Sequence, residues 1–528
     1  MAEPPTVPPG RKESCGYYTG LPDCPTLVGR STTVYDNEVY EKLLDPVEKH
    51  AVVPLWNDSA GPLRRKILEA VKGVDWNAID ILRCGFTSLG HGHLVRPVIP
   101  FVSVEPGSIT WMSGRAVALK CRHVLREHGI HDVKVEIKES RIKQCCSSDQ
   151  DQIESDRSTT KLKPRIPTHK EESFERHNIQ LSEFQETNIA SSQFPTREGT
   201  KGLYLRVRNT ETVVALTCRH VVFGHEEENV DSCRDTNNTR SVLQPGHRTY
   251  QDTKENLHEA ISWINPSLRC YKSPTEKQLE HQCILKANQE RSLQRYKPFE
   301  SMESRTMGYV LLSPKFGLSS SSPALFRDWA IIELHQNKHQ TPLGTLEKIE
   351  PWRTISSVNT GRINMMDMLC GIYTGVMSEA EMRCLDYESA LPGRITIDED
   401  YMRVCMYGSG SGESYGITNT ARSVIRRFVG GVPMISEEWC FLGGIKHGRR
   451  KYSSCQGDPG ASIMGNDGRV AAMLTYGAQG GNTGIHHISY ATSSGWLLED
   501  IRGHEYDVEC MGREVPLEPL HFCVKSEN

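Results

Sequence analysis

The stretch Cys455-Gln-Gly-Asp-Pro-Gly-Ala-Ser462 holds a proline, Pro459, in a glycine-containing segment that favours a tight turn. Pro459 has neither a side-chain hydroxyl nor a backbone N–H, so this position supplies neither a nucleophile nor a hydrogen-bond donor. Downstream, Gly468-Arg-Val-Ala-Ala-Met-Leu-Thr-Tyr-Gly477 is typical of a turn followed by a buried strand. The stretch is therefore predicted to be a loop that leads toward a β-strand, with Pro459 at its turn.

A β-hairpin is predicted upstream, around His220. Gly202-Leu-Tyr-Leu-Arg-Val-Arg208 alternates apolar and polar residues, and Asn209-Thr-Glu211 supplies a turn. Val213-Val-Ala-Leu-Thr-Cys-Arg-His-Val-Val-Phe223 then runs as an apolar, β-branched strand into a polar turn that contains the histidine. The hairpin thus leads directly into His220.

A third segment, Phe326-Arg-Asp328-Trp-Ala-Ile-Ile-Glu-Leu334, places an aspartate at the head of an apolar strand. Each segment has a plain structural interpretation when it stands alone. A histidine beside a strand is usually structural, and an aspartate before a buried strand is usually solvated. The order along the chain, histidine, then aspartate, then the loop at Cys455–Ser462, makes coincidence the poorer explanation.

These ordered segments resemble those of trypsin-like serine proteases, in which a serine occupies the position of Pro459. The resemblance implies that His220 is the general base and that Asp328 orients its tautomer. It also implies that the backbone N–H groups at Gly457 and at position 459 bind the oxyanion, so that the proline removes one of these two donors. One wall of the substrate pocket would be formed by Leu474, Thr475, Tyr476 and Gly477.

The resemblance covers about residues 191–503 and implies a double β-barrel with a cleft between the barrels. Met406-Tyr-Gly-Ser-Gly-Ser-Gly-Glu-Ser-Tyr-Gly416 is similar to a hairpin of intracellular trypsin-like proteins, and Ser494-Gly-Trp-Leu-Leu-Glu-Asp-Ile501 is predicted to be a closing helix. The chain looks most similar to fungal intracellular proteins that carry such a domain behind an N-terminal α/β module.

The residue at position 459 decides whether the chain is expected to be an active hydrolase or an inactive homologue. Ser462, Ser453 and Ser454 lie three to six residues away, and none is expected in the turn that faces the histidine, because a nucleophile and its base must lie within ~2.6–3.2 Å. We therefore expect a pseudoprotease that binds a peptide or protein partner in the cleft or acts as a scaffold. The alternative is an active serine endopeptidase, if Pro459 is a sequence error or another serine supplies the nucleophile. A gene product without function is the third interpretation.

A small α/β module is predicted at residues 30–142. Its expected elements are helices at Pro62–Lys72 and around His123, and strands at Ala78–Arg83, Val95–Val104 and His131–Ile137. The octapeptide that contains His123 nearly repeats the one that contains His220. Because His123 falls on a predicted helix with Gly129 as its C-cap, this match is interpreted as coincidence.

The remaining segments differ in composition. Residues 143–190 are rich in charged and small polar residues, which bury too little apolar surface to offset the loss of conformational entropy on folding. A protease-sensitive linker between two separately stable units is therefore expected. Ser273-Pro-Thr-Glu276 carries an N-cap, a proline at N1 and a capping-box glutamate. A helical insertion at about residues 250–300 is therefore expected on the outside of the barrels, with an apolar face formed by Leu279, Cys283 and Ala287. Flexible tails are expected at residues 1–29 and 504–528.

The overall composition argues against several classes of function. A net charge of −4 and a pI of about 6.6 give no electrostatic reason to propose nucleic-acid binding. No stretch approaches the ~18 consecutive apolar residues of a membrane span, and no secretion signal is recognised. The 17 cysteines are scattered without CxxC pairs, which favours free thiols in a reducing cytoplasm or nucleus. No metal or cofactor is expected, and no oligomeric state is indicated.

Overall fold

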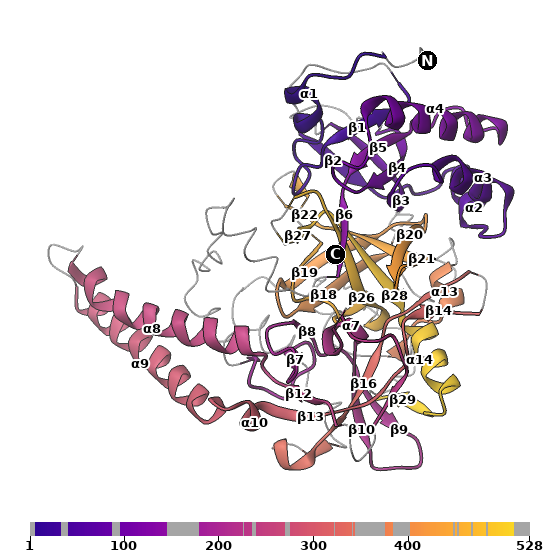
Figure 1. Ribbon diagram of the computed structural model, residues 1–528. Helices are drawn as coiled ribbons and strands as arrows, with labels where there is room; N and C mark the ends of the chain where they lie inside the picture. The colour runs from indigo at the N-terminus through magenta and orange to yellow at the C-terminus, as the bar shows by residue number, and fades with distance from the viewer. Residues whose placement is uncertain are drawn as a thin grey trace, which may run out of the picture.

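The computed structural model describes residues 6–32, 41–86, 96–144, 179–224, 226–234, 239–269, 275–320, 323–339, 342–343, 375–383, 402–446, 449–450, 453–465, 468–481 and 484–511. Within these residues, β-strands in several sheets dominate, and helices lie at the periphery. Three parts follow one another from top to bottom in Figure 1: an N-terminal module, a β-region from the C-terminal part of the chain, and a β-region from the middle of the chain.

The N-terminal module is a sheet covered by helices. Its strands are β1 (Leu27–Arg30), β2 (Lys42–Asp45), β3 (Trp76–Phe86), β4 (Val98–Val104), β5 (Glu136–Glu139) and β6 (Arg141–Gln144), and its helices are α1 (Arg11–Gly16), α2 (Val52–Asn57), α3 (Pro62–Val71) and α4 (Trp111–Glu127). Strands β1, β5, β4 and β3 are neighbours in that order. Helix α4 starts where the Thr110 hydroxyl accepts a hydrogen bond from the Ser113 N–H. It buries Val117, Cys121, Val124 and Leu125 at helical spacing.

The sequence predictions for this module are partly confirmed. The helices expected at Pro62–Lys72 and around His123 are present as α3 and α4, and the His123 side chain is exposed on α4. The strand expected at His131–Ile137 is shorter, because β5 begins only at Glu136. The start of the module differs more strongly from the prediction.

The expected flexible tail at residues 1–29 is wrong for the part that the structure describes. This segment contributes α1 and β1 to the module, and Tyr18 is completely buried. The hydroxyls of Tyr17 and Tyr18 each donate to a carboxylate oxygen of Glu136 at 2.7 Å. These two bonds fix the segment to β5, so the folded module begins well before residue 30.

The lower β-region is a continuous series of antiparallel pairings, which we call the first circuit. Its strands are β7 (Asn188–Ser191), β8 (Glu198–Thr200), β9 (Tyr204–Val207), β10 (Val213–Thr217), β12 (Ser241–Leu243), β13 (Thr306–Ser313) and β16 (Ala330–Leu334). Strand β7 pairs with β12, β12 with β13, β13 with β16, β16 with β10, and β10 with β9. Strand β8 pairs with β7 and leads into β9 along the chain, and among the described residues no pairing joins β8 to β9, so the series stays open there.

The middle β-region, which we call the second circuit, is a closed circuit of antiparallel strands. It consists of β18 (Arg403–Gly408), β19 (Gly412–Thr418), β21 (Val432–Gly443), β28 (Ile488–Ser493), β26 (Arg469–Gln479) and β25 (Ser462–Gly465). Each strand pairs with the next in that order, and β25 pairs back with β18. Helix α14 (Ser494–Gly503) follows β28 and buries Trp496, Leu497 and Ile501 in the core of the first circuit. The two circuits therefore share apolar packing.

Short elements connect and extend the two circuits. They are α7 (Arg219–Val222), β11 (Ser232–Cys233), α10 (Met302–Arg305), β14 (Gly317–Leu318), β15 (Phe326–Arg327), β17 (Gly375–Val376), α13 (Glu379–Arg383), β22 (Ile445–Lys446), β23 (Arg449–Arg450), β24 (Ser454–Cys455), β27 (Ile485–His486) and β29 (Val508–Cys510), with 3-10 turns at Lys297–Phe299 and Gln336–Lys338. Strand β29 pairs with β9 at the edge of the first circuit. The tail expected at residues 504–528 is thus ordered as far as Met511, and the rest lies outside the described residues.

The N-terminal module and the second circuit belong to one hydrogen-bonded sheet. Strand β20 (Ser423–Val429) pairs with β21 on one side and with β3 on the other, where Val424 faces Ile79 and Ile425 faces Ala78. Strand β6 pairs with β26 in addition. This continuity, visible in Figure 1, differs from the expected arrangement of two separate units, although residues 145–178 of the expected linker lie outside the described residues.

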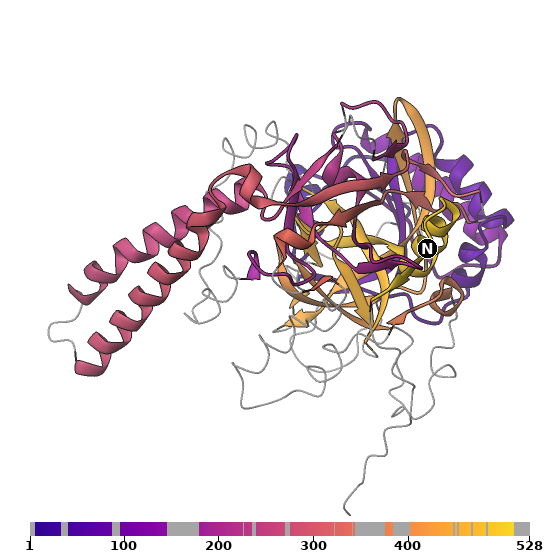
Figure 2. The same ribbon diagram turned by 90° about the horizontal axis from the view of Figure 1, so that it is seen from below.

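The helical insertion forms an antiparallel pair that projects away from the β-regions. Helices α8 (His247–Arg269) and α9 (Glu276–Tyr296) lie side by side in Figures 1 and 2. Their base is packed around Tyr250, Leu257 and Tyr296. The helices themselves were predicted, but the predicted packing is wrong, because the face of Leu279, Cys283 and Ala287 is exposed and does not cover the β-region. None of the described helices is long and apolar enough to cross a membrane.

Candidate active site

His220 and Asp328 are brought together by one strand pairing. Strand β10 ends at Thr217 and the chain turns at once into α7, which carries His220. Asp328 lies two residues before the first residue of the neighbouring strand β16, and Thr217 pairs with Ala330 across the ladder. The register of two rigid strands thus places the histidine and the aspartate side by side.

The two side chains form a closely hydrogen-bonded pair. The His220 Nδ1 lies 2.6 Å from Asp328 Oδ2, and the His220 backbone N–H donates to Asp328 Oδ1 at 3.1 Å. The Tyr476 hydroxyl donates to Asp328 Oδ2 at 2.7 Å. Burial raises the pKa of Asp328, but the charge of His220 and these hydrogen bonds outweigh burial and hold the pKa below its ordinary value. The carboxylate therefore stays ionised and orients the imidazole.

The pair is fully enclosed by protein. The side chains of His220 and Asp328 are both 0% exposed. The adjacent Arg219 is also buried and donates to the backbone oxygens of Ser313 and Pro314 at 3.0 Å. Burial lowers the pKa of Arg219 to about 10, although the nearby Asp328 opposes this shift. A substrate that used His220 as a base would first have to displace part of this packing.

The loop that carries Pro459 is held by both circuits. The N–H of Thr200, at the end of β8, donates to the Pro459 carbonyl at 2.7 Å, and the Thr200 hydroxyl donates to the Gly457 carbonyl at 2.9 Å. The Ser409 hydroxyl, from the turn after β18, donates to the same Gly457 carbonyl at 2.7 Å. At Gly460 the backbone has φ +96°, and a Cβ there would lie 2.1 Å from the Thr200 carbonyl, so only glycine fits this close approach.

Asp458 fixes the other side of the loop. Its carboxylate accepts hydrogen bonds from the N–H groups of Gly410, Ser411 and Cys455 at 3.0, 2.8 and 2.7 Å. Burial raises the pKa of Asp458, and these backbone donors partly offset that effect. The predicted loop is therefore a well-anchored turn, with Gly457 in the left-handed region at φ +97° and with a buried proline where the resemblance expects a serine.

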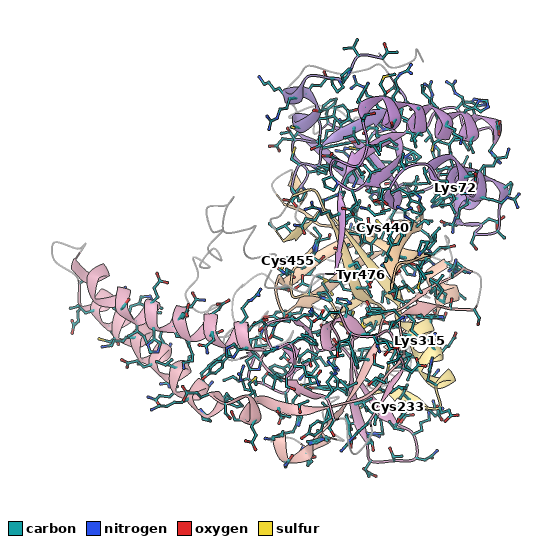
Figure 3. The ribbon with its side chains drawn as sticks, in the orientation of Figure 1. Lys72, Cys233, Lys315, Cys440, Cys455 and Tyr476 are labelled. Atoms are coloured by element: carbon teal, nitrogen blue, oxygen red, sulfur yellow. The ribbon has the colours of Figure 1, made fainter. Side chains whose placement is uncertain are left out.

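The predicted pocket wall, residues 474–477, does not act as one surface. Tyr476 points toward Asp328, as its hydrogen bond requires, and lies among the strands of the second circuit in Figure 3. The Thr475 hydroxyl instead donates to the Tyr490 carbonyl at 3.1 Å. The Leu474 carbonyl accepts from Cys218 Sγ at 3.3 Å, and the face of Gly477 is covered by the His486 ring. The pairing of β26 with β28 shifts register between Leu474 and Tyr476, and neighbouring residues there face different partners.

The serines near Pro459 have partners away from His220. Ser453 and Ser454 each place the hydroxyl 2.6 Å from the Ser489 hydroxyl, and Ser454 also lies 2.8 Å from His486 Nδ1. The Ser462 N–H donates to both carboxylate oxygens of the buried Glu186 at 3.1 and 3.2 Å. The contact between Ser454 and His486 was not predicted from the sequence, because the pairing of β24 with β27 creates it.

The sequence interpretation missed two further residues at the site, Cys218 and Arg427, and expected a different role for Tyr476. Cys218, two residues before His220, lies beside the histidine–aspartate pair. Tyr476 was expected in a pocket wall, not as a donor to Asp328. Arg427 of β20 places its guanidinium carbon 3.9 Å from the centre of the Tyr476 ring and binds the buried Glu438 at 3.0 Å. Of these features, the sequence shows only that Cys218 lies two residues before His220, and this spacing was the one signal that could have indicated Cys218.

A small cavity lies inside the second circuit. Its volume is about 20 Å³, and its lining includes Met406, Phe441, Ser453, Leu474 and Ser489. This space can hold about one water molecule and no amino-acid side chain. A peptide side chain does not fit this cavity without movement of its lining.

Comparisons with known proteins give a limited result. No family model matches the chain, and no curated protein matches it. Among solved structures, the chain is similar to a chymotrypsin from Cellulomonas bogoriensis, with 13% sequence identity and a TM-score of 0.19. This similarity covers 37% of the present chain and 78% of the chymotrypsin chain.

Proposed function

We propose that the chain is a serine-protease homologue of the trypsin-like type that has lost its nucleophile. In this proposal the first and second circuits correspond to the two β-barrels of that fold. The observation that carries the proposal is the combination of an intact His220–Asp328 hydrogen bond with a proline in the anchored loop. Proline supplies neither the hydroxyl that attacks a carbonyl nor the second oxyanion donor.

The proposed role is the binding of an extended peptide or of a protein segment between the circuits, or a scaffold role built on the same surface. The loop from Cys455 to Ser462 supports this role, because Thr200 of the first circuit and Ser409 of the second both hold it in place. An extended partner could add backbone hydrogen bonds to such an anchored segment without any chemistry at Pro459. We further propose a reducing cytoplasmic or nuclear location.

Chemical inactivity is tested with a fluorophosphonate probe, which labels activated serines. The full chain should stay unlabelled under conditions that label an active serine protease. Labelling of the full chain that disappears in a His220→Ala variant would refute the loss of the nucleophile and favour the endopeptidase alternative.

Peptide binding is tested separately with a photo-crosslinking amino acid. The crosslinker replaces Gln456, a half-buried loop residue, and a matched control carries it at Ile284, which is 52% exposed on the projecting α9. A defined library of extended peptides should crosslink at position 456 with sequence preference and not at position 284. Equal crosslinking at both positions would argue against a peptide site at the loop.

A further inference from the structure

Three different metal-binding groups meet at the buried histidine–aspartate pair. Cys218, His220 and Asp328 offer a thiol, an imidazole and a carboxylate, and one ligand atom from each lies within 4.8 Å of the other two. All three residues are buried. The thiol is not required by the protease resemblance, which uses only the histidine and the aspartate.

The backbone holds these three groups on rigid elements. Cys218 is the N-cap residue of α7 at the end of β10, and His220 follows within the first turn of the same helix. Asp328 precedes β16, which pairs with β10. Because the three side chains depend on one strand ladder and one short helix, they can be positioned before an ion binds, which lowers the cost of ordering the ligands.

We propose that Cys218, His220 and Asp328 together bind one zinc ion. Thiolate, imidazole and carboxylate are the ligands that zinc takes in proteins, and hard ions such as magnesium do not favour a thiolate. The charges also fit, since one thiolate and one carboxylate together neutralise a divalent ion in a site without solvent. A neutral group of this kind is more favourable in the interior than an unbalanced charge.

The exchange of protons at the site is simple. Binding forms bonds from the ion to Cys218 Sγ, to a His220 ring nitrogen and to an Asp328 oxygen, and the thiol proton leaves to the buffer. The His220 Nδ1 lies 2.6 Å from Asp328 Oδ2 and shares a proton with it. When the ion binds at Nδ1, this proton moves to Nε2, so the ring stays neutral, and the carboxylate oxygen moves away from the ring to make room for the ion. The Tyr476 hydroxyl remains a donor to Asp328 and orients the carboxylate.

This site is independent of the proposed peptide-binding role. It uses neither Pro459 nor the Cys455–Ser462 loop. A zinc ion on His220 would occupy the nitrogen that a serine mechanism uses for orientation, so the site suits a chain that no longer hydrolyses substrates. Failure of the metal site therefore leaves the nucleophile-loss proposal intact, because that proposal rests on Pro459 and not on an ion.

The test measures metal content of the full chain. Protein is expressed with added zinc, so that the ion can enter during folding, and is dialysed against metal-free buffer before atomic absorption. We compare wild type with Cys218→Ala, a small change at a buried site, and with Cys121→Ala, a matched buried thiol on α4 far from the pair in sequence. Cobalt-substituted samples report thiolate ligation by their absorption spectrum.

The proposal expects about one zinc per chain in wild type and in Cys121→Ala, and the loss of that ion in Cys218→Ala. A Tyr476→Phe variant should bind zinc roughly 10–100-fold more weakly, because it lacks the hydrogen bond that orients the Asp328 ligand. Equal zinc content in Cys218→Ala and wild type would overturn the proposal and assign the metal to other thiols. Absence of zinc from wild type, with no thiolate band from cobalt, would overturn it as well.

Discussion

Arg64 of α3 forms an ion pair with Glu437 of β21, and both side chains are buried, with 4% and 5% exposed. The pair connects the N-terminal module to the second circuit. Glu437 also lies 3.9 Å from Arg383 of α13, whose guanidinium binds Glu379 at 2.7 Å. A charged cluster of this kind couples three segments that are distant in sequence, and its stability depends on keeping every partner.

We expect Glu437→Gln to destabilise the chain by about 3–5 kcal/mol, because removal of one partner leaves buried arginine charge without compensation. The measurement is urea unfolding followed by fluorescence. Glu127→Gln is the control, since its partner Lys66 and Glu127 itself are 48% and 40% exposed, and it should change stability little. Equal effects of the two substitutions would show that the Arg64–Glu437 pair does not couple the two parts.

The shared sheet leads to a prediction about proteolysis. A cut within residues 145–178 should leave the two fragments associated, because β3 pairs with β20 and β6 pairs with β26. The nicked protein should elute from native gel filtration at the position of the intact chain and separate only in denaturant. Separation into two folded fragments without denaturant would instead support two independent units.

Tyr476→Phe should destabilise the protein by about 1.5–3 kcal/mol, the usual range for a hydrogen bond to a charged group. The substitution removes the donor to Asp328 Oδ2 and preserves the ring that lies beside Phe326 and Arg427. Tyr415→Phe, at a side chain that is 38% exposed, provides the control and should have little effect. Thermal unfolding of the two variants compares them directly, and a neutral Tyr476→Phe would contradict the importance of this bond.

Local sequence patterns predicted the parts of the fold that depend on neighbours in the chain. Pro62 at a helix start, the helical spacing after Thr110 and the strand before His220 each specify their own element. The contact between His220 and Asp328 followed from their order in a resembling family, not from the local pattern. The absence of a serine nucleophile at position 459 follows directly from the sequence.

The sequence did not predict features that arise from distant strand pairing. The pairing of β3 with β20 joins residues near position 79 to residues near position 424, and no periodicity records that choice. The exposed face of α9 shows the same limit, because an apolar stripe on a helix does not specify what covers it. Tyr476 and Thr475 were grouped as one wall, whereas their hydroxyls bond to different partners at a register shift of β26.

Lys201 makes stability depend on pH above neutrality. Burial lowers the pKa of Lys201 to about 7, although Glu183 and Glu186 oppose the shift. From pH 7 upward the folded chain releases this proton, while the unfolded chain keeps it until its ordinary value of 10.5. The unfolded state thus binds more protons in this window, so the contribution of Lys201 to stability rises with pH.

The variant Lys201→Met should remove this contribution. The free energy of unfolding, measured in urea between pH 7 and pH 9.5, should rise less steeply for the variant than for wild type, by at most about 1.4 kcal/mol per pH unit. Loss of the 2.8 Å hydrogen bond to Gln244 shifts the whole curve but not its slope. Parallel curves would show that Lys201 keeps an ordinary pKa in the folded chain.

Restoring a serine at position 459 tests how much of a hydrolytic site remains. Pro459→Ser returns a hydroxyl and a backbone N–H to the anchored turn between Asp458 and Gly460. We expect at most weak activity, because the side chains of His220 and Asp328 are both 0% exposed.

The measurement is fluorophosphonate labelling and peptide hydrolysis by Pro459→Ser, with Pro459→Ser/His220→Ala as its control. Slow labelling that requires His220 would show that the new hydroxyl lies within reach of the base. The rate of peptide hydrolysis should then stay far below the rate of labelling, because the small probe displaces less of the packing than a peptide does. Rapid peptide hydrolysis would contradict the closed site, because a serine mechanism needs the histidine and a bound substrate at the same position. If Pro459→Ser shows neither labelling nor hydrolysis, the loop holds position 459 away from His220. Replacement of the serine would then be one of several changes that separate this chain from a working protease.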